Sequence, residues 1–144
     1  MKIDLAIEAV SASEARLARE LLDLGERHRA DHDVFHLTRT LAEQAQQRIS
    51  QLEPHATRYG ASTEPGDEAR GREDGAVALL HDLRTLHLLA AAASIDWTVL
   101  GQGAQAARDP ELLATVTSCH PGALQTLKWT TTRLKEAAPQ ALTS

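Results

Sequence analysis

Four long amphipathic stretches, separated by short breaks, constrain the fold of this chain more than any other feature. Within each stretch the apolar residues recur every three or four positions, as they do along one face of an α-helix, and none shows the alternation typical of a β-strand. The pattern predicts an all-α, antiparallel four-helix bundle that uses residues 1–144 as a single domain. The predicted helices cover residues 4–28, 33–59, 76–102 and 110–137.

The spacing of apolar residues places the start of the first helix close to the N-terminus. Ser11 opens a capping-box sequence, Ser-Ala-Ser-Glu, so a helix that begins at Ser11 is one alternative. Ile3, Ile7 and Val10 continue the same apolar stripe ahead of that sequence. We therefore expect one long helix rather than a shorter one.

Cap residues and glycines set the other predicted boundaries. Asp31 or Asp33 can cap the second helix, because an aspartate side chain accepts a hydrogen bond from a free backbone N–H of the first turn. Gly101 and Gly103 are expected to end the third helix. Asp109, which is followed by proline, is a strong start for the fourth.

Two prolines and one polar segment interrupt the helical pattern. Pro54 predicts a kink in the second helix, because proline cannot donate the backbone hydrogen bond of a helix interior. Pro121 predicts a kink in the fourth helix or its division into two, and a break there could instead turn His120 towards a site. Residues 60–75 carry almost no apolar side chains and predict a long, mobile, polar loop between the second and third helices. Its length allows it either to cross the bundle or to turn back at one end.

Charge and composition exclude several classes of partner. With 20 acidic and 15 scattered basic residues, the chain lacks the basic face that nucleic acid or an anionic membrane surface would select. The most apolar window, Leu86 to Ile95, is too short to span a bilayer. The N-terminal apolar run contains acids, unlike a signal peptide, and the single cysteine, Cys119, permits no internal disulfide. We expect a cytoplasmic protein that binds neither nucleic acid nor membrane.

Three ionisable residues occupy core positions where aliphatic side chains would cost less to bury: Glu14, His87 and His120. Counted from the helix ends, all three fall near the middle of the bundle. Two histidines and a carboxylate can bind a divalent transition metal such as iron, manganese or zinc, and histidine can also ligate haem. The alternative is a structural polar layer, in which Glu14 pairs with Arg48 and the histidines are hydrogen-bonded.

Two segments of the chain, Leu79–Leu86 leading to Ser94–Thr98, and the ending Leu134–Leu142, resemble a family of small, uncharacterised bacterial helical proteins. With its four helices the chain also looks like a ferritin-like bundle. Ferritin-like enzymes bind two iron ions with a Glu on two helices and a Glu-x-x-His on the other two. Here Gln46 stands where the histidine after Glu43 would be, and the fourth helix has no Glu near His120. The resemblance therefore implies a fold without ferroxidase or di-iron oxygenase activity.

Three functions remain open at this point. The first is a non-enzymatic bundle that binds a protein partner, itself as a homodimer, or a small apolar ligand. The alanine run at 90–93 favours this function, because small residues permit close helix approach. The second is a metal- or haem-binding protein that uses Glu14, His87 and His120. The third is an acid–base enzyme with Glu14 as the general base.

Overall fold

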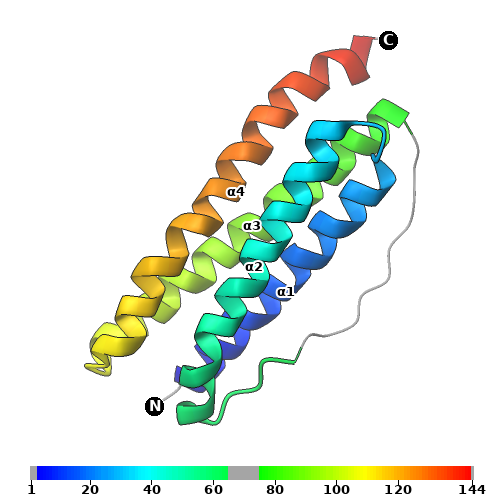
Figure 1. Ribbon diagram of the computed structural model, residues 1–144. Coiled ribbons are helices and arrows are strands. Elements are labelled where there is room, and N and C mark those ends of the chain that lie inside the picture. The colour runs from blue at the N-terminus through cyan, green and yellow to red at the C-terminus, as the bar shows by residue number, and fades with distance from the viewer. Residues whose placement is uncertain (1–2, 65–74, 144) are drawn as a thin grey trace.

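The computed structural model of the protein describes residues 3–64 and 75–143, and these residues form four helices that pack against one another (Figure 1). No strand occurs in this part of the chain, so the all-α prediction is confirmed. The predicted mobile loop at 60–75 lies largely outside the described residues, since only its ends are included. The helices are α1 (Ile3–Arg27), α2 (His32–Tyr59), α3 (Gly75–Ala106) and α4 (Pro110–Thr143).

The helices are arranged so that each has two neighbours. Helix α1 packs against α2 and α3, and α4 packs extensively against α3 but only lightly against α2. The ribbon shows α1 and α4 running in one direction and α2 and α3 in the other, so that α2 ends and α3 begins at opposite ends of the bundle (Figure 1). The lightly packed pair, α2 and α4, leaves one side of the molecule more open than the others.

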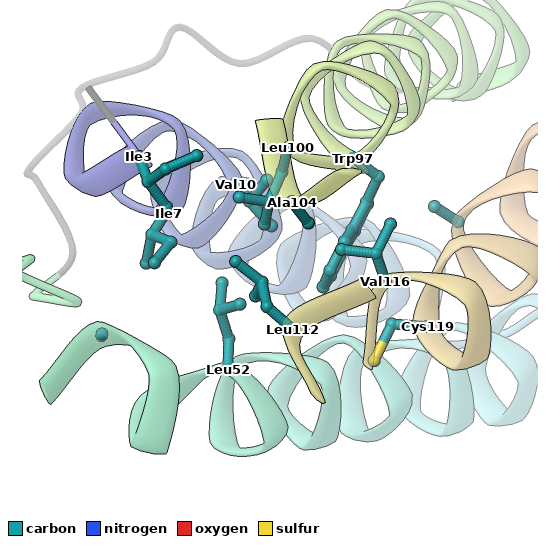
Figure 2. Close-up of a cluster of buried hydrophobic side chains, with 12 residues drawn as sticks. Ile3, Ile7, Val10, Leu52, Trp97, Leu100, Ala104, Leu112, Val116 and Cys119 are labelled. Carbon is teal, nitrogen blue, oxygen red and sulfur yellow. The ribbon is translucent and has the colours of Figure 1, made fainter. Parts of the chain in front are cut away.

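Two clusters of buried apolar side chains fill the interior. One cluster contains Trp97 and Leu112, and Figure 2 shows side chains from all four helices converging in it. The other is built mainly from leucines and alanines, among them Leu21 and Leu86. Between the two clusters, along α1, lie the buried polar residues Ser11, Ser13 and Glu14. These three residues form what we call the polar level, and it separates the two apolar clusters.

The helix starts agree with the cap signals. Helix α1 begins at Ile3, so the longer of the two predicted helices is confirmed. The Asp31 carboxylate accepts a hydrogen bond from the backbone N–H of Val34 at 3.2 Å and caps α2. Asp109 accepts in the same way from Leu112 at 3.0 Å and caps α4.

Two predicted helix ends are wrong. Helix α3 continues through Gly101 and Gly103 to Ala106, because both glycines serve close packing instead of termination. A Cβ at residue 103 would lie 2.8 Å from the Cδ1 atom of Ile3, and one at residue 101 would lie 3.2 Å from a methyl of Val116. Helix α4 also continues past Pro121 to Thr143, so its division into two helices is wrong, whereas the predicted kink stays a prediction.

The apolar part of helix α3 is longer than the window Leu86 to Ile95 that the sequence analysis considered. By length and composition alone it could cross a membrane, which is weak evidence because the core helix of a soluble protein can pass the same test. Two of its acidic side chains are bonded within the bundle: Asp96 accepts a hydrogen bond from Ser13, and Asp82 accepts one from Arg27 at 2.8 Å. These bonds hold α3 against α1.

Candidate functional site

The centre of the polar level is an ion pair between Glu14 of α1 and Arg48 of α2. Glu14 is fully buried and Arg48 nearly so. The guanidinium donates from Nε to Glu14 Oε2 and from Nη2 to Glu14 Oε1, the second at 3.1 Å. This two-point contact matches the planar fork of arginine to a carboxylate, which fixes the orientation of both groups. The pairing proposed for a structural polar layer is therefore present.

Residues of α3 and α4 complete the surroundings of the pair. Trp97 donates its indole N–H to Glu14 Oε2 at 3.1 Å, so both carboxylate oxygens of Glu14 are hydrogen-bonded. On the other side, Arg48 lies over Gly122, where a Cβ would come within 2.7 Å of the Arg48 Nη1 atom. The glycine makes room for the guanidinium. A general base must reach a substrate proton, and this enclosed carboxylate does not favour the acid–base enzyme.

The structure does not bring the predicted metal ligands together. His120 lies with Nε2 3.0 Å from the hydroxyl of Ser94, and His87 lies with Nδ1 2.8 Å from the hydroxyl of Thr130. His87 is seven residues from Ser94 on α3, which places it about 10 Å from the level of His120. The expectation of a common level does not hold, because α3 extends further than the sequence indicated. Among the described residues, no group of three or more His, Cys, Asp or Glu side chains is placed to hold a metal ion.

A groove of about 210 Å³ lies between α2 and α4, where the two helices pack lightly. Arg48 and Cys119 are the buried residues of its lining, and the Cys119 thiol donates to Gln51 Oε1 at 2.9 Å. Burial raises the pKa of Cys119 to about 11, so this thiol is protonated near neutral pH and is a weak nucleophile. The lining residues are Gln44, Gln47, Arg48, Gln51, Ser118, Cys119, Gly122 and Gln125.

A second polar network joins the end of α2 to the start of α4, and it was not predicted from the sequence. Asp109 accepts hydrogen bonds from Arg58 Nη2 at 2.9 Å and from the Tyr59 hydroxyl at 2.7 Å. The backbone N–H of Leu112 and the Tyr59 hydroxyl lower the pKa of Asp109 to about 2. His55 completes the network, since Arg58 Nη2 donates to its Nδ1 at 2.6 Å. These contacts fasten the α2–α4 pair at one end.

Acid is expected to weaken this network through His55. Burial lowers the pKa of His55 below 6.5, and the nearby Arg58 cation lowers it further. As pH falls through 6.5, the unfolded chain binds a proton at this residue before the folded protein does, so the free energy of unfolding decreases. The decrease ends below the lowered pKa of the folded state. Urea denaturation at a series of pH values between 7 and 5 measures the slope.

The matched variant for this measurement is His55→Gln, which retains a polar side chain that does not titrate. The difference in slope between the two proteins isolates residue 55 from the other six histidines of the chain. A parallel pH dependence in both proteins would contradict the assignment.

No family model, curated protein or solved structure matches this chain.

Proposed function

We propose that the chain is a non-enzymatic, ferritin-like antiparallel four-helix bundle that forms a homodimer through the outer face of α3. The observation that carries this proposal is an exposed apolar stripe on a helix that is already packed on its inner side. Ala90 and Ala93 of the alanine run are fully buried, so they contribute to the core and not to a surface. The surface that remains available is on the opposite face of the same helix.

The stripe consists of Leu88, Ala92, Ile95 and Val99, which we call the α3 seam. Their spacing of four, three and four residues places them on one face of the helix. Leu88 is 53% exposed, Ile95 63% and Val99 55%. A row of large apolar side chains in contact with water is a typical sign of an interaction surface.

The α3 seam is complementary to a second copy of itself. Its four positions are symmetric about a point between Ala93 and Ser94. If two α3 helices lie side by side in opposite directions, Leu88 of each copy faces Val99 of the other, and Ala92 faces Ile95. A large side chain then meets a small one at the centre, and every contact occurs twice, as a two-fold symmetric dimer requires.

Polar residues border the α3 seam at both ends. His81 and Arg84 precede it on the same face of the helix, and Gln102 follows it. All three are exposed. An apolar centre with a polar rim is the usual anatomy of a protein–protein interface.

Helix directions support the ferritin-like class. Arg133 of α4 bonds Asp31 at the start of α2 at 3.0 Å, whereas Arg58 at the end of α2 bonds Asp109 at the start of α4. Tyr59 and Gly75 therefore lie at opposite ends of the bundle. The same relation between the second and third helices occurs in ferritin-like bundles and not in simple up-and-down ones.

The proposed dimer is tested by the mass of the protein in solution. Light scattering is expected to give twice the chain mass of 15.6 kDa for the wild type. Ile95→Lys places two like charges in the α3 seam of one dimer and is expected to weaken association on the order of 100-fold, giving the monomer mass. Leu22→Lys is the matched control, because Leu22 is also an exposed, branched apolar side chain but lies on α1, outside the α3 seam. It is 44% exposed.

The results distinguish a second copy of the chain from a lipid surface as the partner of the α3 seam. A wild-type monomer that binds phosphatidylcholine vesicles would replace the second copy with a lipid surface and would overturn the dimer. A wild-type dimer that both lysine variants dissociate equally, or that neither dissociates, would place the interface elsewhere. Circular dichroism of each variant shows that the helices are retained.

A further inference from the structure

We propose that the groove between α2 and α4 is a binding site for a small carboxylate-bearing molecule, with Arg48 as the group that contacts its charge. The site lies on different helices from the α3 seam and does not depend on the proposed dimer. Four observations support it: the groove itself, the Arg48 cation in its lining, the uncharged hydrogen-bonding side chains around it, and a glycine that leaves room for the cation.

The groove exists because α2 packs only lightly against α4. At about 210 Å³ it is smaller than the 300–1,000 Å³ range of drug-sized pockets, so it suits a molecule of few heavy atoms. Polar contacts hold the two helices on both sides of it: Arg133 with Asp31 at one end, and Arg58 with Asp109 at the other. The groove is therefore a feature of the folded bundle and not a frayed end.

The Arg48 guanidinium uses only two of its three nitrogens in the ion pair with Glu14. Nε and Nη2 of Arg48 donate to Glu14. Nη1 donates to none of the described residues and lies over Gly122, which lines the groove together with Arg48. Because Glu14 fixes the other two nitrogens, Nη1 is held in place before any ligand arrives. Such preorganisation reduces the entropy lost on binding.

The walls supply hydrogen bonds without negative charge. Glutamines 44, 47, 51 and 125 surround the opening with amide groups, and Ser118 adds a hydroxyl. No acidic side chain occurs among the described residues that line the groove, although the chain as a whole carries a net charge of −5. A carboxylate can accept a charge-assisted hydrogen bond from Nη1 with one oxygen and a bond from an amide or hydroxyl with the other. The lining therefore selects a small organic anion over a cation.

Gly122 leaves room for the arginine in its present position. A Cβ at this position would come within 2.7 Å of Nη1, so the guanidinium would have to shift. Alanine is otherwise the better helix former, by about 1 kcal/mol. Glycine in the interior of α4 is thus explained by the contact with Arg48 and not by the helix.

The test is a titration of the ¹⁵N-labelled full-length chain with acetate, followed by two-dimensional NMR at constant ionic strength set with chloride. Acetamide, which has the same shape without the charge, is the matched probe. We expect saturable shifts with acetate at the backbone amides of Arg48, Cys119 and Gly122 and their neighbours, and no saturable shift with acetamide. Gly122→Ala is expected to weaken acetate binding about tenfold or more, which corresponds to the loss of one charge-assisted hydrogen bond.

Gln125→Ala provides a second variant that does not touch the Glu14–Arg48 pair, because Gln125 is exposed at the rim. We expect a smaller loss of affinity there, and the NMR spectrum itself reports whether each variant is folded. Equal binding of acetate and acetamide, competition by chloride, or shifts that map away from the groove would each overturn the proposal. Undiminished acetate binding in folded Gly122→Ala would overturn the role of Arg48.

Discussion

Replacing Arg48 by methionine is expected to lower the free energy of unfolding by about 3–5 kcal/mol, because the change leaves the Glu14 carboxylate buried without its counter-charge. Glu14 has no exposed surface, so water cannot solvate the charge in place of the guanidinium. For a chain of 144 residues this loss corresponds to a decrease in the melting temperature of roughly 10 °C or more. Urea denaturation followed by circular dichroism measures it.

The double variant Glu14→Gln/Arg48→Met is the control that separates the charge from the packing. It removes both charges and keeps side chains of similar length, so we expect stability within about 1–2 kcal/mol of the wild type. Trp97 can still donate its N–H to the glutamine oxygen. If the single and double variants were equally destabilised, the loss would come from packing around Arg48, and the account of the ion pair would be refuted.

Replacing Trp97 by alanine is expected to cost about 3–5 kcal/mol, which is the usual range for removing a large aromatic side chain from a core. Trp97 is completely buried and belongs to the apolar cluster shown in Figure 2, where it packs beside Val116. The substitution also removes the indole N–H that bonds Glu14, so it affects both the hydrophobic core and the polar level. Chemical denaturation again provides the measurement.

Two comparison variants resolve these contributions. Trp97→Phe retains most of the aromatic volume but cannot donate to Glu14, and a cost of about 1–3 kcal/mol would be attributed mainly to the loss of this one buried hydrogen bond to a charged group. Trp129→Ala tests the other tryptophan, which is only partly buried, and a clearly smaller loss is expected there. An equal loss at the two tryptophans would contradict the central position assigned to Trp97.

The sequence was most informative where the physical signal is local. Asp109 followed by proline caps a helix by contacts within four residues, and the structure has that cap. The pairing of Glu14 with Arg48 could also be anticipated, because both occupy core-facing positions near the middle of adjacent helices, and a buried carboxylate needs a cation.

Other features depend on distances that no local pattern encodes. Gly101 and Gly103 were expected to end a helix because glycine is common at helix ends. Their actual partners, Val116 and Ile3, are far away in the chain. The position of His87 was misjudged for a related reason, since its level depends on how far α3 extends past its neighbours.

The candidate ligand site was not predictable from the sequence for a different reason. A groove exists where two helices pack lightly, and the packing density between α2 and α4 depends on the shapes of all four helices at once. Glutamine is common on solvent-exposed helix faces, so the glutamines of α2 do not by themselves indicate a site. Only the position of Gly122 beside Arg48 in space distinguishes this surface from the rest of α2 and α4.

Glu14, Arg48 and Trp97 bond to one another at the centre of the bundle but come from three different helices. Their positions in the chain indicate the order in which the helices associate. Glu14 and Arg48 belong to α1 and α2, which are joined by a short turn at residues 28–31, whereas Trp97 comes from the α3–α4 half of the chain. Contacts between residues that are close in the sequence form faster than distant ones. We expect each helical hairpin to form early and the two to dock afterwards. The carboxylate and the guanidinium would then meet while still hydrated, and the rate of docking would include the loss of that water.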